Sequence, residues 1–256
     1  MTGGIVTTKT AFAAEFRMQW RRMALWVVVA ALGGFTLFVA VVGNGPLDEA
    51  STLPIRRVAA EWALLLNVWL PVGVAGLLAD RLPRDRSTGV DELLAATTTS
   101  LPARLLGKVL GATAATLMPV GTVYAVGTAL LAADRGPGVM PVAGAALVVV
   151  ALPGLLAVAA LSVLLPAFTP ATVYLLLFAA GWFWFSAAPG LPGSPAESAV
   201  DPGGWVAASA LFDVPSELTA PAGPAQLAAN LALMAALTAL PLLAVPRVLA
   251  ARAARA

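Results

Sequence analysis

The chain has 256 residues, of which 60% are hydrophobic and only 11% are charged, and its formal net charge is +2. A soluble domain of this length would carry far more charge on its surface. The absence of Cys and His excludes disulfides, thiolate metal sites, Cys nucleophiles and imidazole bases, so we expect neither a metal centre nor catalytic residues. We predict an all-α, polytopic membrane protein in which residues 1–256 form a single transmembrane domain.

The first predicted element is an amphipathic helix over residues 8–23. Phe12, Phe16, Trp20 and Met23 recur at helical spacing and therefore share one face. Polar and charged residues take the remaining surface, namely Glu15, Arg17, Gln19, Arg21 and Arg22. We interpret this segment as a helix in the membrane interface, with its rings at the acyl boundary. The alternative is a basic flank that only fixes topology.

Six apolar stretches follow, each long enough to cross a hydrocarbon core about 30 Å thick. These predicted spans cover residues 24–43, 58–79, 104–132, 139–165, 171–188 and 225–246. Pro119 in the third span and Pro153 in the fourth predict kinks. A row of small residues at the start of the third span, formed by Gly107, Gly111 and Ala115, predicts close packing within the molecule.

The distribution of basic residues predicts the orientation. The two termini and the segment between the second and third spans together carry 12 of the 15 Lys and Arg residues. Because short loops rich in Lys and Arg stay on the cytoplasmic side, we expect both termini and this segment to be cytoplasmic.

The interiors of the predicted spans hold almost no charge. Asn67 and Asn230 are the main polar side chains there, and with the deep-lying Trp69 they are our candidate pathway-lining residues. Because ion-coupled carriers keep charged groups inside their spans, the sequence disfavours that class and favours an apolar or amphiphilic substrate. Trp62 fits an aromatic belt at the membrane surface.

Charge is concentrated in one place, since residues 80–108 hold nine of the 28 charged residues. Within the stretch "DRSTGVDELLAATTTSLPARLLGK", residues 85–108, a short helix is predicted with Asp91 and Glu92 in its first turn, where the helix dipole favours anions. Val90, Leu93 and Leu94 contribute one short apolar stripe. A short helix with apolar and acidic groups suits docking into a groove on a soluble partner. The alternative is a topology determinant with acidic neutralisers.

This stretch resembles the corresponding segment of permeases in the type-2 ATP-binding-cassette (ABC) exporter family. The matching residues are Asp85 with Arg86, Gly89, Glu92, Leu93 with Leu94, Thr97 to Ser100, Arg104, and Gly107 with Lys108. The amphipathic N-terminal helix, the six spans and the larger outer loop before the sixth also match in outline. One departure is "TTTSLP", where many members have Pro directly after the small residues.

The resemblance implies a non-enzymatic permease subunit of a bacterial efflux system in the plasma membrane. A separate P-loop ATPase would bind ATP and Mg²⁺, because this chain lacks GxxxxGK[ST]. The implied coupling residues are Asp91, Glu92, Leu93, Leu94, Arg84, Arg86 and Arg104. The turn at residues 164–170 would be a second, smaller contact. One chain supplies half the helices of a pore, so a second permease copy is expected as a homodimer or a paralogous heterodimer, within a lipid bilayer and without a nucleic-acid partner.

Two questions stay open from the sequence. Residues 189–224 contain seven Pro and five Gly, and this loop is either a re-entrant cap over the exit, as in the resembled family, or a disordered connector. The competing function is a non-transporting membrane scaffold or receptor subunit that docks a cytoplasmic protein.

Overall fold

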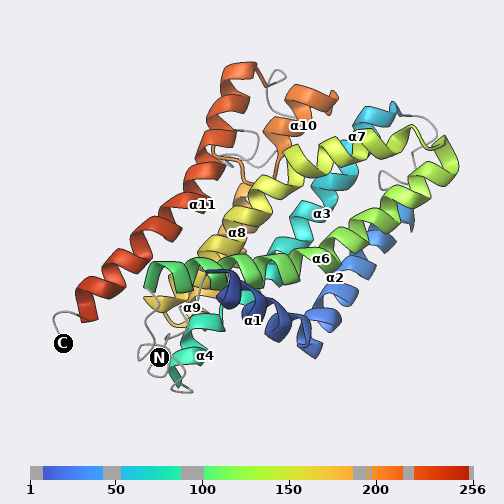
Figure 1. Ribbon diagram of the computed structural model, residues 1–256. Coiled ribbons are helices and arrows are strands. Elements are labelled where there is room, and N and C mark those ends of the chain that lie inside the picture. The colour runs from blue at the N-terminus through green and yellow to red at the C-terminus, as the bar shows by residue number, and fades with distance from the viewer. Residues whose placement is uncertain are drawn as a thin grey trace.

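The structure is a computed structural model that describes residues 8–42, 53–87, 101–186, 195, 198–215 and 222–253. Every regular element within those ranges is helical, so the all-α prediction is confirmed for the described part of the chain (Figure 1). The elements are α1 Thr8–Trp20, α2 Met23–Val42, α3 Ile55–Leu78, α4 Arg81–Ser87, α6 Leu101–Arg135, α7 Val139–Ala146, the π-helix η2 Leu147–Ala151, α8 Leu152–Leu164, the 3₁₀ turn η3 Leu165–Ala167, α9 Ala171–Ser186, α10 Trp205–Phe212 and α11 Pro224–Ala253.

Five of the six predicted spans coincide with helices that are long and apolar enough to cross a membrane. These helical stretches run over Met23–Val42, Ile55–Arg84, Ala103–Arg135, Val139–Ala167 and Pro224–Val245. The fifth predicted span corresponds to α9, which is apolar but has only 16 residues. The chain is therefore a membrane-embedded protein with several apolar helices, and a sixth crossing stays a prediction.

The fourth of these stretches is locally rewound. The amide of Leu152 donates to the carbonyl of Leu147, five residues back, and η2 occupies the preceding turn. Pro153 follows directly, and its ring lacks an amide donor and crowds the turn before it. The π-turn accommodates that proline without ending the helix.

Helix α3 forms the centre of the bundle. It packs against α2, α6, α7, α8, α9 and α10, and most of its residues are therefore buried. Trp62 is fully buried, and its indole N–H donates to the carbonyl of Tyr124 at 3.2 Å. The prediction that Trp62 belongs to a surface aromatic belt is therefore wrong, because its ring packs face to face with Tyr124 inside the bundle.

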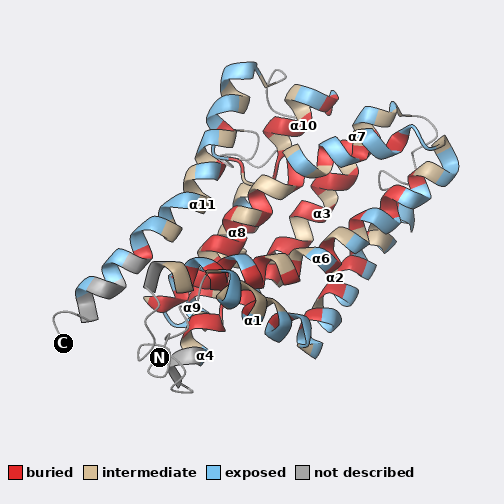
Figure 2. Cartoon of the chain, viewed as in Figure 1, coloured by how far each residue is buried: buried red, intermediate tan, exposed pale blue. Residues whose placement is uncertain are grey.

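Helices α2 and α11 border the bundle and present long apolar surfaces outward (Figure 2). The exposed side chains there include Val27, Phe38, Leu240 and Leu243. Helix α1, α4, η3 and the C-terminal end of α11 lie at one end of the bundle, and α10 lies at the opposite end (Figure 1). We call these the α4 end and the α10 end.

Candidate functional site

The site begins with α1, which lies in a groove on the first half of α6. A Cβ atom added to Gly107 would come within 2.7 Å of the carbonyl oxygen of Thr8, and one added to Gly111 within 2.5 Å of that of Phe12. The two glycines therefore let the helix backbones approach closely, as in small-xxx-small packing. The prediction that this row of small residues packs within the molecule is confirmed.

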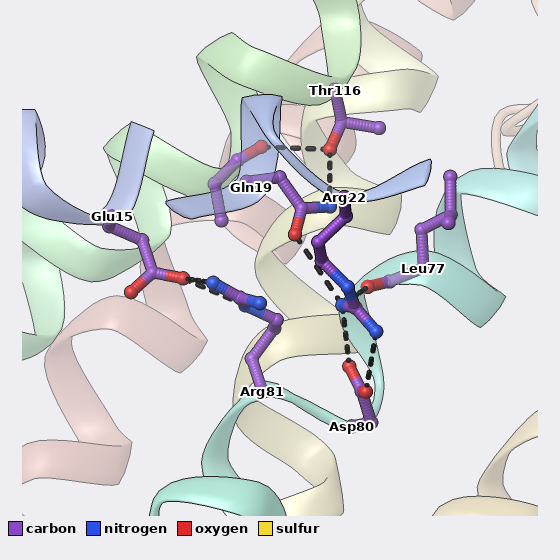
Figure 3. Close-up of polar contacts among 8 residues, drawn as sticks. Glu15, Gln19, Arg22, Leu77, Asp80, Arg81 and Thr116 are labelled. Atoms are coloured by element: carbon purple, nitrogen blue, oxygen red, sulfur yellow. Dashed lines mark hydrogen bonds and ion pairs between the residues drawn. The ribbon is translucent and has the colours of Figure 1, made fainter. Parts of the chain in front are cut away.

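The groove brings the polar side of α1 into the protein. Glu15 is only 5% exposed, and one of its carboxylate oxygens accepts hydrogen bonds from both Nε and Nη2 of Arg81, which is 2% exposed, with an Nε–Oε1 distance of 2.7 Å (Figure 3). Gln19 is fully buried, and its amide donates to the hydroxyl of Thr116 at 3.2 Å. The prediction that Glu15 and Gln19 lie on the exposed polar face of this helix is therefore wrong. They meet polar partners on other elements.

A second ion pair closes the cluster next to the start of α2. The guanidinium of Arg22 donates to both carboxylate oxygens of Asp80, at 3.1 and 2.8 Å, and to the carbonyl of Leu77 at 3.2 Å (Figure 3). Bidentate pairing of this kind fixes geometry as well as charge. Asp80 and Arg81 are consecutive residues where α3 passes into α4. Both ion pairs therefore attach this junction, which we call the corner, to the N-terminal segment.

Lys108 of α6 is also buried in this cluster and interacts electrostatically with Glu15, Arg81 and Asp80. Together with Arg22, the cluster contains three cations and two anions, a net charge of +1. Buried charges are tolerated only when they are paired and hydrogen-bonded. We call these five residues, with Gln19 and Thr116, the corner cluster.

Three of the predicted coupling residues belong to α4 and α6, next to this corner. Arg84 is exposed on α4, Arg86 belongs to the same helix, and Arg104 is partly buried in the first turn of α6. Asp91, Glu92, Leu93 and Leu94 lie outside the described residues. Helix α4 also packs against η3, so the turn 164–170, the predicted smaller contact, lies beside the helix that precedes the predicted coupling segment in sequence.

The candidate pathway residues have defined contacts elsewhere in the bundle. The amide of Asn67 donates to the carbonyls of Pro202 and Gly203, and that of Asn230 donates to those of Ala199 and Asp201. Both side chains thereby hold the segment that precedes α10, which we call the inserted turn, residues 199–204. A role for them in lining a pathway stays a prediction.

The third candidate, Trp69, lies in a cluster of rings. It makes edge-to-face contacts with Phe35, at a centroid distance of 5.2 Å, and with Phe183, at 5.7 Å. Trp69 is partly buried among helices α2, α3 and α9. Its contribution to a pathway also stays a prediction.

The inserted turn reaches deep between the helices. Asn67 lies near the middle of α3, and Gly154, in the middle of the stretch Val139–Ala167, has no side chain to obstruct the carbonyl of Pro202. A Cβ atom added to Gly204, which has φ +94°, would come within 2.4 Å of the carbonyl oxygen of Val150. The described part of the loop before the last helix therefore enters the bundle, which agrees with the re-entrant alternative.

Sequence reasoning missed the carboxyl group in this turn. Asp201 is fully buried and accepts hydrogen bonds from the amides of Gly203, at 2.7 Å, and Val206, at 3.2 Å, at the start of α10. Burial raises the pKa of Asp201 to about 7, although the backbone N–H groups act in the opposite direction. The available signal was an acidic residue four positions before a short apolar helix, close enough for its carboxylate to accept from the free amides of the first helical turn.

Comparison of the chain with family models, with curated proteins and with solved structures finds no match. Among the described residues, no group of three or more acidic side chains is placed to hold a metal ion. The function of the chain is therefore inferred from the geometry of the corner cluster and the inserted turn.

Proposed function

We propose that this chain is the transmembrane permease subunit of an ATP-driven exporter of the type-2 ABC class. A second permease copy would complete the pathway, and a separate P-loop ATPase would supply the energy. The substrate would be hydrophobic or amphiphilic, because the spans offer almost no charge to a passing molecule. The proposal also places the chain in a bacterial plasma membrane with both termini in the cytoplasm.

The observation that best supports this proposal is the way the corner cluster anchors α4. Asp80 and Arg81, at the base of α4, are ion-paired to Arg22 and Glu15 in the N-terminal segment. A helix that receives force from an ATPase needs a firm attachment to the spans, since a loosely held helix would yield without moving them. The two ion pairs and the groove on α6 provide such an attachment for the segment that leads into the predicted coupling helix.

A second supporting observation is the position of the turn around η3 at the α4 end. The turn around η3 packs beside α4 and exposes Leu165, Thr169 and Pro170. In this proposal, a docked ATPase contacts this turn as well as the predicted coupling helix, which follows α4 in sequence. A scaffold or receptor subunit would need a docking surface, but no rigid connection from that surface to the spans.

The test is co-expression of the tagged chain with the nearest encoded P-loop ATPase, followed by purification in detergent. We expect the ATPase to co-purify, and Asp91→Arg/Glu92→Arg to release it or to uncouple its ATP turnover. The matched control is Asp134→Arg, which reverses an exposed carboxylate in the last turn of α6, at the α10 end.

Three outcomes are informative. If no ATPase co-purifies with the wild type, the exporter proposal fails and the scaffold alternative takes its place. If the ATPase stays bound with unchanged turnover in the double variant, the complex stands but the assignment of Asp91 and Glu92 is wrong. If Asp134→Arg has the same effect as the double variant, the effect is not specific to the coupling segment.

A further inference from the structure

The outward side of the N-terminal segment carries positive charge without a balancing acid. Lys9, Arg17 and Arg21 are exposed and form no ion pair within the described part of the chain. Glu15 is the sole acidic residue between residues 8 and 42, and it is buried against Arg81. Burial of that carboxylate therefore makes the exposed surface of α1 uniformly basic, which the amphipathic sequence pattern does not reveal.

Aromatic rings adjoin this basic surface and extend it towards the first span. Phe12, Phe16 and Trp20 stack in sequence along α1, with centroid distances of 6.0 and 5.9 Å. Trp26 of α2 packs edge-on against Trp20 at 4.6 Å, and its indole N–H donates to the carbonyl of Trp20 at 3.0 Å. The aromatic row therefore continues from α1 onto the first turns of a helix long enough to span the membrane.

The exposed side chains at the start of α2 indicate where the aromatic row of α1 lies relative to the lipid. Met23 and Val27 are 75% and 60% exposed at the start of α2, beside Trp26, which is 40% exposed. Exposed apolar side chains at the start of a span face acyl chains. Indole rings concentrate where acyl chains meet headgroups, and basic side chains next to them extend to the headgroup phosphates.

We propose that this basic and aromatic surface, formed by Lys9, Phe16, Arg17, Trp20 and Arg21, binds the headgroups of anionic phospholipids in preference to zwitterionic ones. The charge fits an anionic headgroup, and the continuity with the lipid-facing side of α2 favours a lipid over a soluble acidic protein. Exposed basic residues at the end of a span attract anionic lipids in this way. This proposal does not depend on the chain being an exporter.

The experiment uses the full chain in nanodiscs made of phosphatidylcholine with a small fraction of brominated lipid. Bromine on the acyl chain quenches nearby tryptophans, so Trp20 and Trp26 report local lipid composition. Their contribution is the difference between the wild type and Trp20→Phe/Trp26→Phe, since the chain has seven tryptophans. Brominated phosphatidylglycerol is compared with brominated phosphatidylcholine at equal mole fraction and low salt.

We expect stronger quenching of this pair of tryptophans by the anionic lipid. Arg17→Gln and Arg21→Gln should each reduce the preference about fivefold, and salt should weaken it. The control is Arg247→Gln, which removes an exposed charge from α11 at the same end of the bundle.

Three results would overturn the proposal. Equal quenching by the two lipids in the wild type would mean that the surface does not select charge. An equal loss in the Arg247→Gln control would mean that the chain attracts anionic lipid only through its overall charge. If Arg17→Gln instead released a co-purifying ATPase with no change in lipid preference, the surface would bind protein and not lipid.

Discussion

Removing the carboxylate of Glu15 should cost more stability than removing the guanidinium of Arg81, although the two groups form one ion pair. Glu15→Gln leaves Arg81 buried with the cationic Lys108 as an electrostatic neighbour and without its anion. Arg81→Gln leaves Glu15 buried, but Lys108 still provides an opposite charge. The expected difference between the two variants comes from Lys108. In an isolated ion pair, removal of either charge would leave one buried charge without a partner, and the two losses of stability would be similar.

The magnitudes follow from burial. Breaking a buried ion pair by removing one partner costs about 3–5 kcal/mol, and we expect Glu15→Gln to fall in that range and Arg81→Gln below it. The double variant Glu15→Leu/Arg81→Met removes both charges and should recover most of the loss. The less buried control is Glu61→Gln. Glu61 and its partner Arg57, one turn away, are 22% and 32% exposed, and this change should cost less than about 1 kcal/mol.

The measurement is reversible unfolding in mixed micelles of detergent and SDS, followed by tryptophan fluorescence. Equal costs for the two single variants would show that Lys108 does not act on this pair. A double variant no more stable than Glu15→Gln would show that removal of the second charge does not relieve the loss of the first. If Glu15→Gln lowered the free energy of unfolding no more than Glu61→Gln, the polar side of α1 would not be buried against the bundle.

Three further predictions use the same unfolding assay or a related one. Gly111→Ala should destabilise the protein by about 1–3 kcal/mol, because its methyl group meets the carbonyl of Phe12, whereas Gly121→Ala in the same helix has open space and should not. Because the pKa of Asp201 rises from 3.8 to about 7 on folding, the free energy of unfolding should fall as pH rises from about 4 to 7, and Asp201→Asn should flatten that slope across a pH series. Asn230→Leu leaves two backbone carbonyls unpaired and should cost about 1–3 kcal/mol, with faster hydrogen exchange across 198–215 than in the wild type.

The sequence predicts the helices well because their signals are local. Apolar runs near the length of a bilayer mark five of the spans, and the spacing of Phe12, Phe16 and Trp20 marks α1. The glycine row of α6 is likewise visible as a pattern within two turns. Each of these features depends on residues only a few positions apart.

The contacts of polar side chains could not be predicted in the same way. Glu15 looks like a surface residue of an amphipathic helix until Arg81, 66 residues later, is placed beside it. The insertion of the turn before α10 is likewise determined by Asn67 and Asn230, which belong to distant spans. Proline and glycine content alone is compatible with insertion or with a disordered connector. Burial of Trp62 also depends on Tyr124, 62 residues away.

Helix α3 connects the two polar regions of the molecule. Asp80 follows its last turn and joins the corner cluster, and Asn67 near its middle holds the inserted turn. Thirteen residues separate these positions, about 20 Å along a helix. Pro71 lies between them and, without an amide hydrogen, leaves the carbonyl of Asn67 without its usual helical donor. In the proposed exporter, a displacement of α4 would therefore reach the inserted turn along one helix. The missing helical hydrogen bond therefore falls at Asn67, the residue whose side chain holds the inserted turn.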